Sequence, residues 1–355
     1  MVLYGKKTLL SRFVSAILCL FVPLCLVLLA GCEEDNTAWP SEIKPGYYHS
    51  QYEGSTDKGA AFLVCGTGGR LDRVFEDGTL ENVPLPVGDK DLTNVLISGD
   101  ITLVGGLSGG LAFSRDGKVF EASKGADNAH ITGLAQFNGK YYACTYSGKI
   151  LSSADGVTWK TSKNLTDKPL IAIAADDSYI VAITDDTDIF KSADDSSWDS
   201  WNYNERYDGL SEKLSFQNLM CTESRFYCLG YPVDNPSTPT VMFSFDGGES
   251  WMNVVSQEIN NRSPYEFYPL AVRSVSNFGD NLLAACDRGR VLIFSDCPSC
   301  NMVMNVLNVD LHCIAVCGSD AVLVAGEDFE FSVLSKKDIE DFSISIQEAD
   351  GDFLY

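Results

Sequence analysis

Three small groups of residues have side chains that could support chemistry. Cys297-Pro298-Ser299-Cys300 has the spacing of a thiol redox pair, Asp185-Asp186-Thr187-Asp188 could offer oxygens to Ca²⁺, and His49, His130 and His312 could bind Zn²⁺. A redox pair needs a helix N-terminus to lower its thiol pKa, whereas this pair falls in a predicted β-turn, so a local disulfide or two free thiols is favoured. The Asp run lacks the Gly and distal Glu of an EF-hand loop, and the histidines lack ligand spacing. The sequence therefore predicts no cofactor and no metal site.

Acidic residues dominate the charge of the chain, which has 355 residues and a formal net charge of −23. Residues 1–31 contain Lys6, Lys7 and Arg12 and no acidic residue, so their removal would change the net charge from −23 to −26. A surface this acidic repels nucleic acid and anionic lipid, and we expect neither as a partner. Glycosidase chemistry requires only two well-spaced carboxylates, which 49 acidic residues readily supply.

The first 31 residues have the layout of a secretory signal. A basic segment precedes an apolar run over residues 13–30, which Pro23 interrupts and small residues end, and these features favour a processed signal over a permanent membrane helix. Leu29-Ala30-Gly31-Cys32 resembles the bacterial lipobox, and the resemblance implies that Cys32 is lipidated. The segment Glu33-Glu34-Asp35-Asn36 resembles the acidic export tag of Bacteroidetes surface lipoproteins, with an ordinary acidic linker as the alternative. We therefore expect a bacterial outer-membrane lipoprotein that faces the periplasm or the cell exterior.

A turn motif repeats every 39 residues and organises most of the chain. In Ser153 to Trp159, an Asp carboxylate can bind backbone N–H groups, a Gly supplies a positive φ, and the Trp returns to the core. Copies lie at residues 114–120 and 192–198, with Asp195 in place of the Gly in the second copy, and a full copy lies at Ser244 to Trp251. A period of about 40 residues indicates one supersecondary unit per repeat.

Each repeat predicts four short antiparallel strands. In one repeat these are Ile131–Phe137, Lys140–Tyr146 and Lys149–Ser153, with turns at Asn138-Gly139 and Ser147-Gly148 and a fourth edge strand after the Asp turn. A unit of this kind is one blade of a β-propeller. The sequence therefore predicts an all-β, seven-bladed propeller of four-stranded antiparallel blades, with six or eight blades as alternatives.

The predicted propeller covers residues 47–335. A signal peptide at 1–31 and an acidic tether at 32–46 precede it, and an acidic C-terminal segment at 336–355 follows it. Within that segment, residues 342–346 alternate like a half-buried strand and could close the last blade.

The motif Ser-x-Asp-x-Gly-x-Ser/Thr-Trp resembles the Asp-box, or BNR, repeat of sialidases, sortilin-type receptors and the photosystem assembly factor family. The resemblance implies that the Asp turn joins the third and fourth strands on the rim away from the active face and serves folding rather than chemistry. The positions that match are Asp116, Ser153, Asp155, Gly156, Trp159, Asp194, Trp198, Ser244, Asp246, Gly248 and Trp251. The Arg-Ile-Pro motif of sialidases is absent, which argues against sialidase chemistry.

Nine of the twelve cysteines remain once Cys19 and Cys25 leave with the signal and Cys32 is lipidated. Nine thiols cannot all pair, so at least one is free. Four of them lie at nearly matching places in the second strands of different repeats: Cys65, Cys144, Cys228 and Cys286. Propeller geometry separates such positions, and we predict that these thiols fill tight space between blades.

Insertions break the period in the later repeats and indicate the working surface. Segments 202–211 and 232–239 and the connection 257–268 all join strands at the face opposite the Asp turns. Their side chains are the candidate ligand-binding residues: Tyr203, Arg206, Tyr207, Tyr231, Arg262, Tyr265, Phe267 and Tyr268. Aromatic and Arg side chains are common in sugar and protein contact surfaces, although such rings also pack long loops.

These features together favour a surface-anchored propeller that binds a glycan or a periplasmic or surface protein. A carbohydrate-active enzyme on the same fold is the alternative, and the sequence favours binding over catalysis.

The lipobox generates a first prediction. Cys32→Ser removes the thiol that would be acylated, so we expect the chain to move from the membrane fraction to the soluble periplasm or medium on ultracentrifugation. Cys19→Ser, within the signal, is the control and should leave the chain with the membranes. A Cys32→Ser chain that still sediments with membranes contradicts the lipoprotein interpretation.

Overall fold

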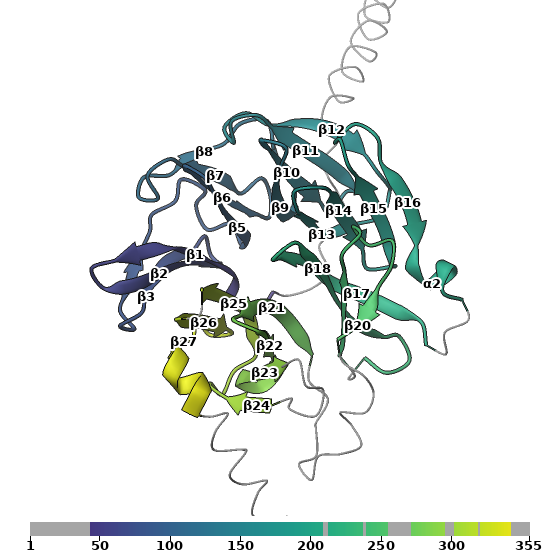
Figure 1. Ribbon diagram of the computed structural model, residues 1–355. Coiled ribbons are helices and arrows are strands. Elements are labelled where there is room, and N and C mark those ends of the chain that lie inside the picture. Colours follow the sequence, from purple (N-terminus) through teal and green to yellow (C-terminus); the bar gives the residue numbers. More distant parts are fainter. Residues whose placement is uncertain are drawn as a thin grey trace, which may run out of the picture. The chain divides into compact units, whose positions relative to one another are not determined.

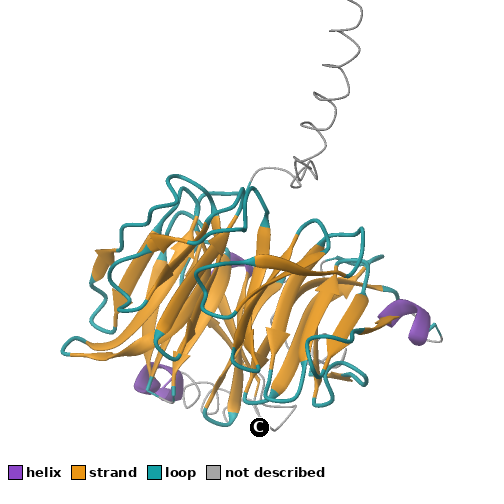
Figure 2. Ribbon diagram, turned by 90° about the horizontal axis from the view of Figure 1, so that it is seen from above, coloured by secondary structure: helices purple, strands orange, loops and turns teal. Residues whose placement is uncertain are grey.

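The structure is a computed structural model that describes residues 43–208, 212–236, 239–254, 271–294, 302–318 and 320–341. The chain divides into a unit of residues 1–38 and a unit of residues 39–355, and all described residues belong to the second. This unit is a ring of antiparallel sheets, with loops on its two faces (Figures 1 and 2). None of its described helices has the length and apolar composition needed to span a bilayer.

Seven sheets follow one another along the chain, and within each sheet the strands pair in sequence order. Blade 1 comprises β1 (Tyr47–Thr56), β2 (Gly59–Gly66), β3 (Leu71–Phe75) and β4 (Leu80–Asn82), and blade 2 comprises β5 (Leu92–Ser98), β6 (Ile101–Gly106), β7 (Leu111–Ser114) and β8 (Glu121–Ala122). Blade 3 comprises β9 (Ile131–Phe137), β10 (Lys140–Thr145), β11 (Lys149–Ser153) and β12 (Lys160–Asn164). Blade 4 comprises β13 (Leu170–Ala175), β14 (Ile180–Thr184), β15 (Asp188–Ser192) and β16 (Asp199–Asn202). The short helix α2 (Tyr203–Arg206) follows β16.

Blade 5 comprises β17 (Leu214–Thr222), β18 (Arg225–Pro232), β19 (Thr240–Ser244) and β20 (Met252–Asn253). Blade 6 comprises β21 (Val272–Phe278), β22 (Asn281–Cys286), β23 (Arg290–Phe294) and β24 (Met302–Asn305). Blade 7 comprises β25 (Leu311–Cys317), β26 (Ala321–Gly326) and β27 (Phe331–Ser335). A 3₁₀ turn, η1 (Asp287–Gly289), lies between β22 and β23.

The seven-bladed, all-β prediction is confirmed. In blade 3 the strands β9 and β11 have the predicted bounds, and β10 ends one residue before the predicted Tyr146. Blade 7 has three strands among the described residues, followed by a helical segment at 336–341. The predicted closing strand at 342–346 lies outside the described residues.

Apolar side chains on both surfaces of each sheet form the core. The described residues contain seven buried clusters, one at each interface between neighbouring blades. The second strands are therefore mainly apolar, as in β2, where seven of eight residues are buried. Cys65, Cys144, Cys228 and Cys286 belong to four different clusters, which agrees with their predicted place between blades. Burial raises the pKa of the Cys144 thiol to about 12, so this thiol stays protonated at neutral pH.

The first strand of each blade lies innermost and contacts the first strands of its neighbours (Figure 1). Each of these seven strands shifts register against its partner near its start, as a β-bulge does, at the second residue in six of them and at the fourth residue in β17. The bulged residues are Tyr48, Thr93, Thr132, Ile171, Gln217, Arg273 and His312. The bulges therefore place seven side chains around the axis, at the end where the first strands begin.

The Asp turns join the third and fourth strands and close by hydrogen bonds. Asp155 Oδ1 accepts from the backbone N–H of Val157 at 2.9 Å and of Thr158 at 3.0 Å, and Ser153 Oγ donates to it at 3.0 Å. Trp159 Nε1 donates to Gly156 O at 2.9 Å. The turns at Asp116 and Asp194 repeat the paired backbone bonds, and that at Asp246 keeps the bond from Ser250 N at 2.9 Å.

Asp195 occupies the position that Gly156 holds in blade 3, and both have positive φ, 64° and 73°. Asp tolerates this conformation better than most residues. Its carboxylate accepts hydrogen bonds from the Tyr142 hydroxyl and from Lys140 Nζ, the latter at 2.6 Å. The replacement of Gly by Asp therefore adds a polar link between blades 3 and 4.

A second prediction concerns the Trp residues of the Asp turns. Trp159 is 3% exposed, whereas Trp198 and Trp251 are half-buried. Trp159→Ala should lower the free energy of unfolding by about 3–5 kcal/mol, the cost of a large buried deletion. Trp198→Ala and Trp251→Ala should cost less because more of each ring is already in water. Urea unfolding measures all three, and equal losses would contradict this ranking.

A third prediction concerns acid stability. Backbone hydrogen bonds to its carboxylate lower the pKa of Asp194 from 3.8 to about 2. Because the folded pKa lies below the unfolded one, the carboxylate stabilises the fold above about pH 4, and this contribution is lost as the pH falls towards 2. Asp194→Asn should therefore be less stable than the original chain at pH 7. The difference in stability between the two chains should become smaller as the pH falls.

The matched control is Asp199→Asn, in the neighbouring strand β16, where the side chain is exposed. Thermal unfolding between pH 3 and pH 7 compares the two variants with the original chain. If the stability difference between Asp194→Asn and the original chain is constant over this range, the stabilising effect of the Asp194 side chain does not depend on the charge of its carboxylate, and the prediction is wrong.

Candidate functional site

The two described insertions lie side by side on one face of the ring. Asn202 caps α2 by accepting a hydrogen bond from Glu205 N at 3.1 Å, and Tyr203 N donates to Thr187 O at 2.9 Å. Val233 N donates to Lys213 O at 2.8 Å, which joins the second insertion to the end of the first. The described parts of both insertions, 202–208 and 232–236, therefore lie on the face of the ring opposite the Asp turns. Segment 257–268 lies outside the described residues.

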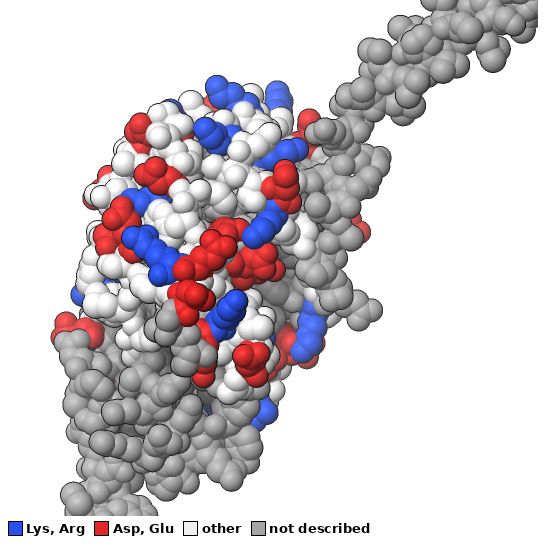
Figure 3. Space-filling view, turned by 90° about the vertical axis from the view of Figure 1, so that its right-hand side faces the viewer, with Lys and Arg blue, Asp and Glu red and all other residues white. Residues whose placement is uncertain are grey.

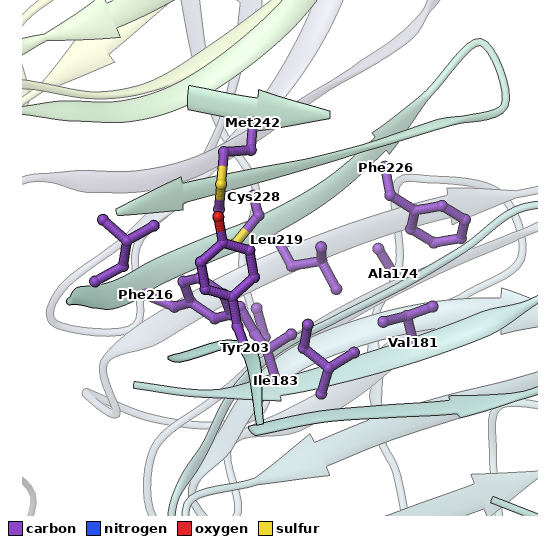
Figure 4. Packing of buried hydrophobic residues seen from close by; sticks show 12 residues of the cluster. Ala174, Val181, Ile183, Tyr203, Phe216, Leu219, Phe226, Cys228 and Met242 are labelled. Carbon is purple, nitrogen blue, oxygen red and sulfur yellow. The ribbon is translucent and has the colours of Figure 1, made fainter. Parts of the chain in front are cut away.

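The structure corrects the predicted role of Tyr203. Its side chain is 6% exposed and belongs to the core between blades 4 and 5, among Ile183, Phe216 and Met242 (Figure 4). The short helix turns this ring inward, because an insertion of this length needs an apolar contact of its own. Tyr203 therefore anchors the loop and is not available to a ligand.

The other described candidates also pack against neighbours. The ring of Tyr207 lies 4.8 Å from that of Tyr203, and its hydroxyl donates to Glu249 O at 3.5 Å. The guanidinium carbon of Arg206 lies 5.4 Å from the Trp201 ring, and Tyr231 pairs with Ser215 between β17 and β18. The remaining candidates, Arg262, Tyr265, Phe267 and Tyr268, lie outside the described residues, as does Cys32. The rings of Tyr203 and Tyr207 thus support the loop that carries them.

A polar pocket of about 480 Å³ lies beside α2 on this face. It is formed by the connection from β12 to β13, the turn from β14 to β15 and the insertion after β16. The side chains that line it in the described part of the chain are all charged or amides: Lys168, Asp186, Asn202, Asn204, Glu205, Asp208 and Lys213. Figure 3, which views the ring from the side that carries α2, shows acidic and basic side chains interspersed there.

Hydrogen bonds fix the positions of Lys168, Asn202 and Asn204, which form the inner wall of the pocket. Lys168 Nζ lies 2.8 Å from Asp188 Oδ2 and 3.1 Å from Asp186 Oδ2, and its hydrogen bonds to these two carboxylates raise its pKa. Asn202 Nδ2 donates to Asp186 O and to Asp188 Oδ1, each at 2.8 Å. Asn204 exchanges two hydrogen bonds with the backbone of Leu214, at 2.8 and 2.9 Å. The wall is therefore positioned in advance of any ligand.

Thr187 has an unusual backbone conformation at the base of this wall. Its φ is 68°, whereas the equivalent positions in blades 2 and 3 are Gly109 and Gly148, with φ of 72° and 78°. A β-branched residue is strained in this region, and such strain persists where surrounding contacts hold it. Thr187 Oγ1 donates to Asn202 Oδ1 at 3.3 Å and accepts from Asn204 N at 3.4 Å. The strained residue thus ties the turn to the insertion that forms the pocket.

Sequence reasoning found the insertion but not the pocket. From sequence, Asp185 to Asp188 indicate only a Ca²⁺ candidate without the features of an EF-hand loop. The described residues hold no group of three or more His, Cys, Asp or Glu arranged for a metal. The missed lining residues come from three separate loops. One available signal was the Thr at position 187, 39 residues after Gly148, where the turn otherwise uses Gly.

The pocket can offer hydrogen bonds, but its carboxylates are not desolvated. The side chains of Glu205 and Asp208 are exposed, and that of Asp186 is 67% exposed. A general acid at neutral pH needs a raised pKa, which burial usually provides. The arrangement therefore suits recognition of polar groups better than proton transfer.

Comparisons with solved structures support the architecture. YCF48 from Cyanidioschyzon merolae is 14% identical, with 84% of this chain and 98% of that chain covered and a TM-score of 0.59. Virginiamycin B lyase from Staphylococcus aureus is 11% identical (81% and 97% covered, TM-score 0.59). The extracellular domain of BT4673 from B. thetaiotaomicron is 10% identical, with 83% of this chain but 39% of that chain covered and a TM-score of 0.58. At these identities the similarity shows the fold alone.

A search of curated proteins found no match. The family model described as the DUF6242 beta propeller domain matches residues 112–289, from β7 in blade 2 to η1 in blade 6. This match spans half of the sequence and includes the pocket and both described insertions. The chain therefore belongs to the DUF6242 β-propeller family.

Proposed function

We propose that this protein is a bacterial lipoprotein, anchored through Cys32, whose propeller binds a ligand in the pocket beside α2. The observation that carries the proposal is the pocket itself, which forms where an insertion departs from the repeat. Its lining is polar, its wall is held by Lys168, Asn202 and Asn204, and its outer side chains are open to water. The similarity to the extracellular domain of BT4673 supports a place outside the cytoplasm.

The chemistry of the lining favours a hydroxyl-rich ligand, such as a glycan. Carboxylate oxygens on Asp186, Glu205 and Asp208 accept hydrogen bonds from hydroxyl groups, and the ammonium group of Lys213 donates them. Among the described residues no apolar side chain lines the pocket, so an apolar ligand would gain little from those that do. The acidic surface disfavours nucleic acid and anionic lipid.

Peptide binding is the second candidate. A solved structure of YCF48 holds a D1 peptide, and that structure shares the fold of this chain with a TM-score of 0.59. A peptide with exposed basic and hydroxyl side chains would also suit the lining of the pocket. A carbohydrate-active enzyme is less well supported, because the exposed carboxylates lack the desolvation that an acid catalyst needs.

A fourth prediction tests the pocket. The double variant Asp208→Ala/Lys213→Ala removes one acceptor and one donor from the rim and should weaken ligand binding at least tenfold, about 1.4 kcal/mol. The Cys32→Ser chain, purified whole, is screened on a glycan array and against a basic peptide library, and hits are measured by calorimetry.

The matched control is Asp100→Ala/Lys118→Ala, which changes the same two residue types on the face of the Asp turns, where both are exposed. It should leave the affinity unchanged. Equal affinity in the two double variants would place the binding site elsewhere, and a hit among peptides but not glycans would select the second candidate.

A further inference from the structure

Three neighbouring bulge positions carry side chains that the other blades do not have there. In blades 2 and 3 the bulged residue is Thr, and its Oγ1 donates to the first strand of the next blade, from Thr93 to Ile131 O at 2.8 Å and from Thr132 to Leu170 O at 2.7 Å. In blades 6, 7 and 1 the bulged residues are Arg273, His312 and Tyr48. The strands that carry them, β21, β25 and β1, contact one another in that order around the axis. At the position where blades 2 and 3 have a structural Thr, three neighbouring blades thus have ionisable side chains.

The Arg273 guanidinium group is hydrogen-bonded through Nε, whereas its two terminal nitrogens are open to solvent. Its Nε donates to Asp287 Oδ1 at 3.1 Å, and Ala271 N donates to the other carboxylate oxygen at 3.3 Å. Its carbonyl accepts from Asn218 Nδ2 at 3.2 Å, which fixes the backbone. Within the described part of the chain, its two terminal nitrogens make no hydrogen bond, and the side chain is 39% exposed. These two nitrogens have the geometry that grips a carboxylate with two parallel bonds.

His312, at the equivalent bulge position of the neighbouring strand β25, offers an acceptor. Its Nδ1 lies 3.2 Å from Tyr47 O, and because a carbonyl can only accept, Nδ1 carries the hydrogen and Nε2 has the lone pair in the neutral ring. Burial, and after it the positive charge of Arg273, lower the pKa of His312, so the ring is neutral at pH 7. The Tyr48 ring packs on it with centroids 4.6 Å apart, and the Tyr48 hydroxyl donates to Lys44 O at 2.8 Å.

The acidic groups around this row are already engaged. Glu327 Oε1 lies 2.5 Å from Lys44 Nζ, and Asp310 Oδ1 accepts from Arg288 N at 2.8 Å. Asp287 is occupied by Arg273 and by the Ala271 amide. An anionic ligand at Arg273 would therefore meet carboxylates that already have partners, and Lys44 is itself paired with Glu327.

We propose that Arg273, His312 and Tyr48 form an axial binding site for a hydroxy acid, a ligand with a carboxylate and a hydroxyl group on neighbouring carbons. The two terminal nitrogens of Arg273 bind the carboxylate, His312 Nε2 accepts from the hydroxyl, and the Tyr48 ring stacks behind the imidazole. The site lies in blades 6, 7 and 1, whereas the pocket beside α2 lies in blade 4. It does not depend on the function proposed for that pocket.

The probe is D-glucuronate, a carboxylated sugar, with D-glucose as its uncharged counterpart and acetate as a carboxylate without the hydroxyl. Calorimetry on the whole Cys32→Ser chain should show saturable binding of glucuronate and none of glucose at this site. Arg273→Gln should weaken glucuronate binding at least tenfold. The control is Arg115→Gln, at an arginine that is 54% exposed on the opposite face, and it should have no effect.

A second variant separates the two contacts. His312→Phe keeps a ring against Tyr48 but removes the acceptor, so it should weaken glucuronate and leave acetate unchanged. NMR titration of His312 gives an independent readout: its pKa should rise in Arg273→Gln, which removes a positive neighbour, and should rise in the original chain on binding of glucuronate. Failure of glucuronate to bind, or equal binding by the original chain and Arg273→Gln, overturns the proposal.

Discussion

The structure depends on one constraint, namely that each blade must bury both of its surfaces against its neighbours. A single four-stranded sheet of about 40 residues cannot cover its own apolar side chains, so a blade is stable only between two others. The seven buried clusters meet this requirement, one at each interface. The constraint explains why the second strands carry unbroken apolar runs, and why small buried residues such as Cys144 recur there. It also leaves the two faces of the ring free to vary.

The same constraint must be met where the ring closes, between the last blade and the first. No strand of one blade is contributed by the other end of the described chain. This seam is held by packing, by side-chain bonds and by a short backbone bridge between Gly46 and Glu327, beside which Asp328 N donates to Pro45 O at 2.9 Å. Tyr47 of blade 1 packs on Phe329 of blade 7 with ring centroids 5.3 Å apart, and its hydroxyl donates to the buried Asp72 at 2.5 Å. His312 and the Lys44–Glu327 pair cross the same seam. The side chains of the proposed axial site thus lie where closure already demands well-ordered contacts.

The sequence predicts the repeating part of this structure well, because the period acts on every blade in the same way. The turn at Asn138-Gly139 and the Asp turn at Asp155 have local chemistry that fixes strand ends to within a residue. The insertions could be located because they break the period. What could not be predicted is where their side chains point: Tyr203 looks like a contact residue in the sequence but lies in the core, since α2 turns it inward. The pocket was missed because its lining comes from three loops whose approach only the fold determines.

The two candidate sites share a physical origin, which is the replacement of a residue that the repeat uses for structure. At position 187 a Thr stands where other blades have Gly, and the strain it holds is offset by bonds to the pocket wall. At positions 273, 312 and 48, larger ionisable residues stand where Thr93 and Thr132 tie neighbouring blades together. His312 keeps this tie, because its Nδ1 lies 3.2 Å from Tyr47 O of the next blade, whereas Arg273 and Tyr48 form hydrogen bonds with Asp287 and Lys44 instead. In a ring of seven similar blades, the remaining contacts can carry stability where these two residues give up the tie. Departures of this kind from the repeat are therefore more informative about function than the repeat itself, since the repeat is explained by packing alone.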